Sequence, residues 1–584
     1  MTYGSFDAAA SEEPSASDAA GAAPSPPASI SVSSELDFIG HGRFTWIMLF
    51  VLGLANSSDA VELLALSFIV PVLKTTGGEL AGISNAGIAA LQAAIFAGML
   101  VGGVFFGVAA DVFGRRKMLA ISLGINAVFG LVSAFSNTFG LLFFARVMGG
   151  FGVGGSIPGG AARAPEPVSP LRSPGFPHLT PRRKCFRTPP EPSAVFTLAA
   201  ELLPTAHRSF WLSTVAWWWM VGALFSSGAA WLIIGEEGLS WQIFAAVAAV
   251  PAAAASALVL LLLPESPHFF VSRGSNDSAR SALCYIARIS GKESRLVRGW
   301  NLAVPLPPLH GASDEESAAQ SQAATSNHAL AESATGSQSV PLEGEKDVLL
   351  VSGGAPTTGR VATLLPASRR LNLLILAQDM LNPVRDLISS EYSRTALTLS
   401  VVWFCLSFGW YGLLLWVPTL FAGLDLQLDI YQDSFLVSAA NLPGNIVSAL
   451  LFNYVGTKSV LFYSMIFAAL SAAAFPFART EATVLLATCT LNAVSTCSWN
   501  ALDCLSTEAF PSRLRTTSIG LLSATGRIGS IVGQFVFAAL LQVSSAALLV
   551  SAAVALGCGA LAALALPPGP GIVAIYKKRA RGGL

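Results

Sequence analysis

Charged residues are scarce in this 584-residue chain, and their scarcity argues against a soluble globular protein. Only 12% of the residues are Asp, Glu, Lys or Arg, whereas 53% are apolar. A soluble globular protein has about 25% charged residues. The 34 basic residues balance the 34 acidic ones, so the net charge is zero and no nucleic-acid partner is expected.

Cysteine is also sparse, and its positions suit packing rather than chemistry. The seven cysteines fall mostly inside apolar segments and have the spacing neither of a metal site nor of a secreted disulfide framework. The chain has no nucleophile–base set of the kind that enzymes use. We therefore expect no enzyme activity, no catalytic residue, no metal and no cofactor.

The chain does contain many long apolar segments. A helix needs about 20 apolar residues to cross a hydrocarbon core of about 30 Å. Twelve segments meet this requirement: 44–73, 86–110, 118–137, 139–158, 209–235, 241–263, 395–421, 432–453, 459–477, 483–505, 516–542 and 544–567. The sequence therefore predicts an all-α membrane protein with twelve transmembrane helices in two six-helix bundles.

Polar segments flank and separate these bundles. The first residues are rich in Ala, Ser and Pro without the apolar core of a signal peptide, and the central stretch has low complexity. Five regions follow: a disordered N-terminal tail (1–43), the first bundle (44–263), a largely disordered inter-bundle loop (264–394), the second bundle (395–567) and a basic tail (568–584). The inter-bundle loop contains two possible amphipathic helices, at 278–290 and 370–390.

The distribution of Lys and Arg among the short loops predicts the orientation, because these residues favour the cytosolic side. The even-numbered loops and the C-terminal tail are basic. The odd-numbered loops carry only Lys74 and Arg479 among seven acidic residues. Both termini, the inter-bundle loop and the basic tail are therefore expected to be cytosolic.

The two halves repeat each other at matching positions. Glu201-x-x-Pro-x-x-x-Arg208 at the end of the fourth span matches Glu508-x-x-Pro-x-x-x-Arg515 at the end of the tenth. The loops after the second and eighth spans also match, in Asp111-Val-Phe-Gly-Arg-Arg and Asn453-Tyr-Val-Gly-Thr-Lys. Such repeats mark transporters whose substrate site lies between the halves near the bilayer midplane.

These motifs carry a family resemblance over residues 38–273 and 386–567. Gly107-x-x-x-Asp-x-x-Gly114-Arg115-Arg116-Lys resembles the loop signature of the major facilitator superfamily. Sugar porters have motifs that are similar to Arg146-x-x-Gly149, to Pro264-Glu-Ser-Pro267 and to the two Glu-x-x-Pro-x-x-x-Arg motifs of this chain. Asp59-Ala-Val-Glu62 and the aromatic residues 403–412 resemble the synaptic-vesicle-protein-related branch, which includes nicotinate and organic-ion transporters.

Three charged residues lie inside predicted spans. Asp59 and Glu62 share one face of the first span. Asp59 lies about 8 Å short of the far interface, and Arg146 lies about 10 Å from that same side. A lone charge in the membrane is costly, so such residues pair or face a cavity. One interpretation is proton coupling, as the resemblance to sugar–proton porters implies. The alternative is a permanent structural ion pair.

A second set of residues is a candidate substrate site. Arg527 lies near the middle of the eleventh span, where its guanidinium suits a carboxylate-bearing substrate, or else it pairs with Asp503. Aromatic and amide side chains suit a planar or cationic solute, although such residues often face lipid or other helices. The candidates are Arg527, Trp403, Tyr411, Asn492, Trp499 and Asn500. Asn441, Pro443 and Asn445 also predict a break in the eighth span.

The motifs at the cytosolic helix ends form a candidate gate. They can make charge networks that hold the two bundles together when the pore is open outward, and that break on inward opening. Topology alone also explains basic residues on this side. The candidate gating residues are Gly107, Asp111, Gly114, Arg115, Arg116, Glu201, Arg208, Glu508 and Arg515. The second copy lacks the Asp and the double Arg, so the network should be lopsided.

Residues 159–193 depart from the family pattern. Their prolines and basic residues cannot lie in hydrocarbon, so the segment interrupts the span between Arg146 and Glu201. It is either a genuine loop at the cytosolic interface or the product of a retained intron or faulty gene model.

The sequence thus predicts a secondary active transporter of a small organic solute, working by alternating access and driven by a proton or another cation. The solute is an organic ion, a nicotinate-like carboxylate or a sugar. A non-transporting vesicle protein or sensor with the same fold is the alternative. We expect a monomer surrounded by membrane lipid, either in the plasma membrane or in an intracellular vesicle membrane.

Overall fold

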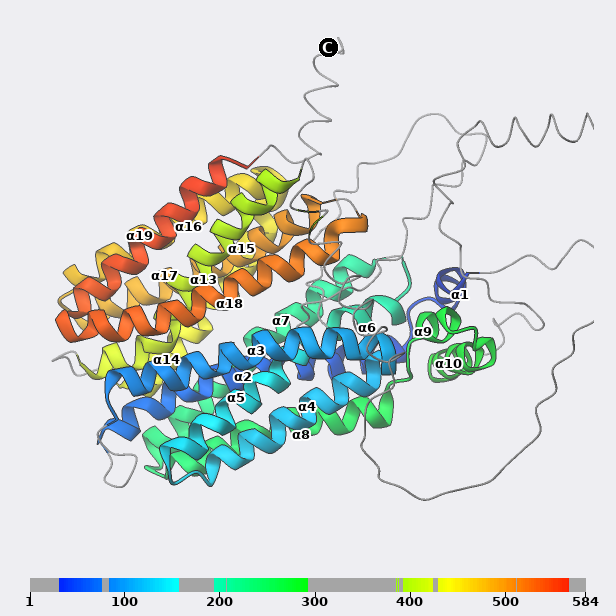
Figure 1. Ribbon diagram of the computed structural model, residues 1–584, viewed down its shortest axis with the longest axis horizontal. Helices are drawn as coiled ribbons and strands as arrows, with labels where there is room; N and C mark the ends of the chain where they lie inside the picture. The colour runs from blue at the N-terminus through cyan, green and yellow to red at the C-terminus, as the bar shows by residue number, and fades with distance from the viewer. Residues whose placement is uncertain are drawn as a thin grey trace, which may run out of the picture. The chain divides into compact units, whose positions relative to one another are not determined.

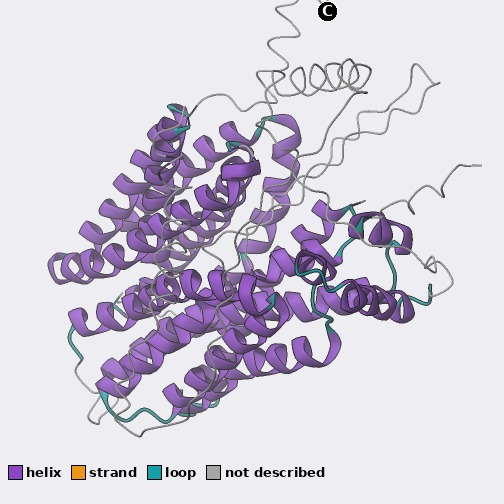
Figure 2. Ribbon diagram, turned by 45° about the vertical axis from the view of Figure 1, so that its right-hand side comes forward, coloured by secondary structure: helices purple, strands orange, loops and turns teal. Residues whose placement is uncertain are grey.

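The computed structural model describes residues 31–75, 83–156, 194–205, 207–292, 385, 387, 392–423, 429–510 and 512–566, all within one compact unit. These residues form helices and loops, with no strand among them (Figure 2). The first half contains α1 (Val32–Ile39), α2 (Arg43–Thr75), α3 (Asn85–Phe113), α4 (Arg115–Ala134), α5 (Phe139–Ser156), α6 (Ala194–Leu202), α7 (Arg208–Ala230), the π-helix η1 (Trp231–Glu236), α8 (Trp241–Leu262), α9 (Pro267–Ser272) and α10 (Asn276–Ile289). The second half contains α13 (Ser393–Ala422), α14 (Ile430–Ala439), α15 (Asn441–Tyr454), α16 (Thr457–Ala474), the 3₁₀ helix η3 (Phe475–Phe477), α17 (Glu481–Glu508), α18 (Ser512–Val543) and α19 (Ser545–Leu564).

Eleven helical segments in the described part of the chain are long and apolar enough to cross a membrane. They coincide with eleven of the twelve predicted spans. The remaining prediction corresponds to α17, which has 28 residues but is rich in Ser, Thr and Asn. Several of these polar side chains bond to α15 and its N-terminal end: Thr496 Oγ1 donates to Asn441 Oδ1 over 2.8 Å, and Cys497 Sγ donates to the Gly444 carbonyl over 3.1 Å. The all-α fold of two six-helix bundles is confirmed (Figure 1).

Two predicted spans are interrupted. The eighth breaks at Ala440, between α14 and α15, next to the predicted Asn and Pro cluster. The fourth is described as α5, ending at Ser156, and α6, beginning at Ala194. The predicted insertion 159–193 lies outside the described residues.

Glycine sets the close approach of α3 and α5, the helix that carries Arg146. A Cβ atom added to Gly98 would lie 2.1 Å from the Val147 carbonyl oxygen, and one added to Gly150 would lie 2.2 Å from that of Ile95. Small residues that let two backbones meet are a main source of helix association in lipid, because lipid leaves no hydrophobic driving force between helices. These glycines thereby fix the position of Arg146.

The two halves contact each other mainly where α18 packs against α3, α13 against α2 and α14 against α7, with smaller contacts of α14 with η1 and of α15 with α7. Gln92 Nε2 of α3 donates a hydrogen bond across this interface to the Leu415 carbonyl of α13 over 3.0 Å. Aromatic rings cross it as well, with Phe96 5.4 Å from Tyr411 and Trp219 5.8 Å from Trp410 between ring centroids. The contact region therefore combines apolar, aromatic and amide groups.

Short helices gather at one end of the first half, where α10 contacts α1, α2 and α9 (Figure 1). The amphipathic helix predicted near 278–290 is α10. Helix α1 falls in the segment that we expected to be disordered. It forms because Val32, Leu36 and Ile39 bury one apolar face, while the Ser31 hydroxyl caps its N-terminus.

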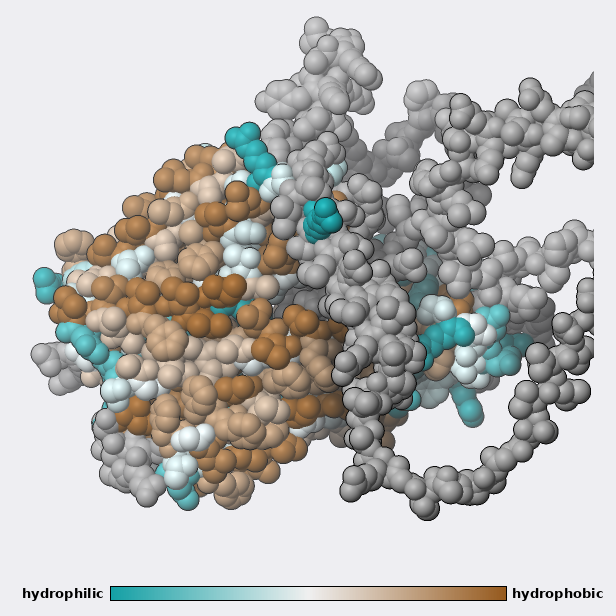
Figure 3. All heavy atoms as spheres, in the orientation of Figure 1, coloured by the Kyte–Doolittle hydropathy of each residue, from teal (hydrophilic) through white to brown (hydrophobic). Residues whose placement is uncertain are grey.

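The face of the two helix groups that Figure 3 shows is largely hydrophobic. Val101, Phe105, Leu261 and Leu561 are among the large apolar side chains that lie more than half exposed. A soluble monomer rarely exposes such a surface. It is the surface that a protein surrounded by lipid tails presents.

Candidate functional site

A buried ion pair links α2 and α5. Arg146 donates from Nη1 to Glu62 Oε1 over 2.9 Å, and the two residues are 1% and 4% exposed. Arg146 Nη2 also donates to Ser133 Oγ of α4 over 3.1 Å. The sequence placed Arg146 with either Asp59 or Glu62, and the structure pairs it with Glu62.

Asp59 lies one turn earlier on α2 and contacts a different group. Its Oδ2 is 2.6 Å from the Ser156 hydroxyl, which belongs to the last residue of α5. Asp59 and Ser156 are 2% and 1% exposed. The two carboxylates that share one helix face therefore have distinct partners on α5, and sequence reasoning did not identify Ser156.

Glycines form the walls around the Glu62 carboxylate. A Cβ atom added to Gly149 of α5 would lie 2.8 Å from Glu62 Oε1, and one added to Gly130 of α4 would lie 3.4 Å from Oε2. The Gly149 of the Arg146-x-x-Gly149 motif therefore makes room for the carboxylate that Arg146 binds.

An aromatic cluster lies where the two halves meet. Tyr411 and Trp410 of α13 have ring centroids 4.7 Å apart, and Trp499 of α17 lies 5.4 Å from Tyr411 and 5.7 Å from Trp410. Trp403 lies 5.5 Å from Trp499. Four of the six predicted substrate-site residues, Trp403, Tyr411, Trp499 and Arg527, come together here.

Two donors of this cluster have no hydrogen-bond partner among the described residues, namely Arg527 Nη1 and Trp499 Nε1, both of which are buried. The Arg527 guanidinium lies 5.8 Å above the Tyr411 ring. The described ion pairs give Arg527 no acidic partner, so the alternative pairing with Asp503 receives no support. A buried donor without an acceptor costs about 1–3 kcal/mol.

The two predicted asparagines have different surroundings. Asn492 Oδ1 accepts from Trp410 Nε1 over 3.2 Å and so orients a ring of the cluster. Asn500 instead donates to Asn445 Oδ1 and Ser448 Oγ of α15 over 2.6 and 2.7 Å. Trp410, an aromatic residue of the seventh span, was not among the six candidates although it stands next to Tyr411, and nothing in the sequence singled out Phe96.

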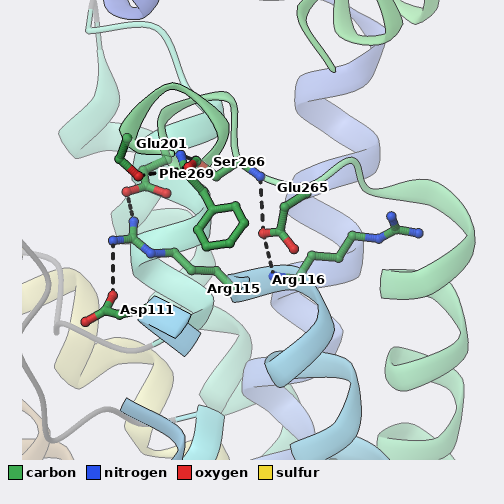
Figure 4. A network of polar contacts seen from close by, with 8 residues as sticks. Asp111, Arg115, Arg116, Glu201, Glu265, Ser266 and Phe269 are labelled. Atoms are coloured by element: carbon green, nitrogen blue, oxygen red, sulfur yellow. Dashed lines mark hydrogen bonds and ion pairs between the residues drawn. The ribbon is translucent and has the colours of Figure 1, made fainter. Parts of the chain in front are cut away.

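A charge network occupies one end of the first half (Figure 4). Arg115, at the start of α4, pairs with Asp111 of α3 at 3.7 Å and with Glu201 of α6. Glu265 Oε1 accepts from the Arg116 amide over 3.0 Å and therefore caps α4. Between them, Gly114 adopts φ 105°, with Glu265 Oε2 where a Cβ atom would lie.

The equivalent end of the second half follows the repeat with fewer charges. Gly456 has φ 86°, close to the conformation of Gly114. Arg116 donates to the Val259 and Leu260 carbonyls near the end of α8, and Lys458 donates to those of Leu564 and Leu566 at the end of α19. In both halves, a basic residue therefore satisfies carbonyls at a helix C-terminus.

The second copy replaces the ion pairs by weaker contacts. Thr457, at the position of Arg115, has its hydroxyl 3.8 Å from Cys504 Sγ, which lies 3.9 Å from Glu508 Oε1. All three ion pairs between described side chains lie in the first half. The side chains of Arg513 and Arg515 lie outside the described part, so the expected asymmetry of the network stays a prediction. The three ion pairs join α2 to α5, α3 to α4 and α4 to α6 within the first half, rather than bridging the halves.

The remaining gating candidates lie elsewhere. The Arg515 side chain lies outside the described part, so its role remains a prediction. Gly107 lies on α3, one turn before Asp111.

The segment between α6 and α7 holds further charged groups. Arg208 donates from Nη2 to the Leu203 carbonyl over 2.9 Å, and Thr205 donates from its amide and hydroxyl to Asp37. Burial lowers the pKa of Arg208, while nearby Asp37 acts in the opposite direction. Burial, together with the positive charges of Arg208 and Arg115, lowers the pKa of His268 on α9 to about 4. His268 is therefore neutral near pH 7.

Comparisons with known proteins agree with this architecture. A model of the Major Facilitator Superfamily matches residues 45–174, and a model of the family "Sugar (and other) transporter" matches residues 193–298. The fold is similar to a partially occluded inward-open structure of the xylose transporter XylE from E. coli, with a TM-score of 0.55, 16% identity and coverage of 90% of this chain and 98% of the other. The chain therefore resembles the major facilitator superfamily both in these two sequence matches and in its fold.

Within the superfamily, the chain resembles curated vesicle proteins. It is 24% identical to the human synaptic vesicle glycoprotein 2C and 26% identical to the synaptic vesicle glycoprotein 2A of Rattus norvegicus. Each alignment covers 90% of this chain, and 79% and 78% of the relative. A structure of the proton:xylose symporter XylE bound to 6-bromo-6-deoxy-D-glucose has a TM-score of 0.54 at 18% identity, covering 90% of this chain and 96% of the other. The chain is a multi-pass membrane protein with a sugar-porter-like transporter fold.

Proposed function

We propose that the protein is a secondary active transporter that moves a small organic anion by alternating access, driven by a proton. One observation carries the choice of substrate. Arg527 Nη1 and Trp499 Nε1 are buried donors without described partners, and both side chains approach Tyr411. An anionic ligand that accepts from both would remove the cost of leaving them unpaired.

The surroundings favour a planar carboxylate over a sugar or an organic cation. A guanidinium presents a donor fork that fits a carboxylate, and Arg527 would repel a cation. The rings of Trp403, Trp410, Tyr411 and Trp499 offer flat apolar surfaces for an aromatic body. A nicotinate-like acid combines both features.

The buried charges on α2 and α5 support proton coupling. Asp59, Glu62 and Arg146 are nearly fully buried inside membrane-crossing helices, where charge is costly unless it serves a function or is paired. We propose that one of the two carboxylates binds and releases the coupled proton. The charge network around Arg115 would then stabilise one end of the first half until that end rearranges on opening.

The test uses the purified protein in liposomes with an imposed pH gradient. Labelled nicotinate and benzoate should accumulate, whereas choline and xylose should not. Arg527→Ala should raise KM for nicotinate about ten- to hundredfold, as expected for a lost bond to a charged group, and Arg527→Lys should have a smaller effect. Trp499→Phe should raise KM about two- to tenfold.

Trp416→Phe is the matched control. The Trp416 indole donates to Gln534 Oε1 over 2.9 Å inside the second half, so its loss should lower stability without changing KM. Accumulation of choline or xylose in place of the acids would contradict the anion proposal.

The second candidate is a vesicle membrane protein that does not transport, and the names of the similar synaptic vesicle glycoproteins support its location in a vesicle membrane. In that case Glu62 and Arg146 form a permanent structural pair. Two results together would support this alternative over the transporter. The protein would be folded in an intracellular vesicle membrane, and none of the solutes in a broad panel would show pH-driven flux.

A further inference from the structure

The short helix α1 carries an acid on the face that it buries. Val32, Glu35, Leu36 and Ile39 recur at helical spacing and so share one face, and none of the four is more than 4% exposed. The three apolar residues belong to the same hydrophobic cluster as the buried face of α10, which α1 contacts (Figure 1). Glu35 therefore lies within the contact that docks α1 onto the first half.

The Glu35 carboxyl group gains little in return for its burial. Its Oε2 atom is buried and has no hydrogen-bond partner among the described residues. Burial raises the pKa of Glu35 above its ordinary value. An ionised carboxylate at this position loses its hydration without gaining a donor, whereas the protonated carboxyl is much less costly to bury. The docked position of α1 therefore favours neutral Glu35.

Charged groups on the neighbouring segments make other contacts. Lys292, just after α10, donates from Nζ to the Ile39 and His41 carbonyls over 2.7 Å each and so holds the C-terminal end of α1. Burial, rather than a neighbouring charge, is what raises the pKa of Glu35. The titratable groups on the segments next to α1 are Asp37 on α1 itself, His41 and Arg43 where α2 begins, His207 and Arg208 where α7 begins, and Arg288 and Lys292 near the end of α10.

The exposed side of α1 binds one of the candidate gating motifs. Asp37 accepts hydrogen bonds from both the amide and the hydroxyl of Thr205, which lies inside the motif Glu201-x-x-Pro-x-x-x-Arg208 between α6 and α7. Helix α1 therefore ties α10 to this motif. A helix of eight residues is not stable by itself in water, so α1 depends on its docked face. When that face leaves its contact, the helix and its bonds to Thr205 are lost together.

We infer that α1 is a pH-sensitive latch, which docks while Glu35 is protonated, holds the α6–α7 segment through Asp37 and is released when Glu35 ionises. The pKa of Glu35 is higher in the docked state than its ordinary value of 4.5. Docking is therefore strongest below pH 4.5 and weakens as the pH rises through the raised pKa. Between these two values, the ratio of docked to released α1 falls by up to about tenfold for each pH unit. Neither the transported solute nor the coupling ion enters this inference.

Amide hydrogen exchange of the full-length protein at pH 5, 6, 7 and 8 tests the latch. The peptides to follow are those that cover α1 and Thr205, and the wild type is compared with Glu35→Gln at each pH so that the intrinsic pH dependence of exchange cancels. Exchange in the wild type relative to Glu35→Gln should rise with pH in both peptides, by up to about tenfold for each pH unit. Glu35→Leu, whose side chain suits the apolar face, should stay as protected as Glu35→Gln.

Asp37→Asn is the matched control, since it makes the same change of acid to amide two residues further along, on the exposed side of α1. It weakens the contact with Thr205, so it should speed exchange by a similar factor at every pH and keep the pH dependence of the wild type. A constant ratio between the wild type and Glu35→Gln from pH 5 to pH 8 would overturn the inference. So would an α1 that is unprotected at every pH in Glu35→Gln, because the latch would then require the carboxylate rather than its neutral form.

Discussion

Arg146 of α5 and Glu62 of α2 form a hydrogen-bonded ion pair of 2.9 Å that is almost completely removed from the surface. Removing one partner of such a pair leaves an uncompensated buried charge, which typically costs about 3–5 kcal/mol. We therefore expect Arg146→Ala to lower the thermal unfolding temperature strongly in detergent. Glu62→Gln should also lower it, although the amide oxygen can still accept from Arg146.

The double variant Glu62→Gln, Arg146→Gln separates charge from packing. It removes both charges and should recover much of the stability that either single change loses. Additive losses in the double variant would contradict a direct interaction between the two residues.

Gly149 makes the second prediction. In Gly149→Ala, the new Cβ atom would lie 2.8 Å from Glu62 Oε1, so the carboxylate must move away from Arg146. We expect at least a tenfold loss of pH-driven uptake, corresponding to about 1.4 kcal/mol. Gly140→Ala is the control on the same helix, because a Cβ atom there meets nothing within 4 Å. Equal transport in the two variants would show that the Glu62 position is not critical.

The spans were predictable because a bilayer requires about 20 apolar residues per crossing, whatever else the helix does. Helix α17 forms where the tenth span was predicted, but it is too polar along much of its length to count among the eleven apolar helices. The partner of Arg146 was not predictable, since Asp59 and Glu62 share a helix face and differ by one turn. The space beside Gly149 and Gly130 accommodates the Glu62 carboxylate and so decides which carboxylate pairs with Arg146. Only side-chain geometry reveals that space.

The substrate site stays a prediction, and the sequence could not show which of its residues lie together. Aromatic and amide residues on α13 and α17 are visible in the sequence, but their helix faces are not. Asn500 therefore turned out to bond to α15, whereas Phe96, from the other half, lies against Tyr411. Helix α1 was missed because its short apolar face is hidden in a segment rich in Ala, Ser and Pro.

His268 gives a prediction for pH dependence. Its pKa is lowered from 6.5 to about 4 by burial and by Arg208 and Arg115. Between these two values the unfolded chain binds a proton that the folded protein does not, so stability falls as pH drops from 6.5 towards 4. His268→Asn should reduce this loss. Unfolding temperatures of the wild type and variant at pH 7, 6, 5 and 4 check it, and parallel curves would contradict it.

The asymmetry between the two halves gives the last prediction. Arg115 contacts Asp111 and Glu201, whereas Thr457, at the equivalent position of the second half, has only a weak contact with Cys504. Arg115→Ala leaves Glu201 without its cation, so it should loosen this end of the first half and favour its opening. Thr457→Ala, the matched control, should have little effect.

Spin labels would measure this opening. They would be attached to cysteines placed at the exposed positions Lys117 and Tyr454, with the exposed Cys284 and Cys558 replaced by Ser, and would report the separation of the two helix ends. A loss of about 1.4 kcal/mol changes the ratio of open to closed populations tenfold. The charge-swapped double variant Arg115→Glu, Glu201→Arg should restore part of the closed population. An equal shift in Arg115→Ala and Thr457→Ala would mean that the ion pairs do not control opening, and that the basic residues at this end serve topology alone.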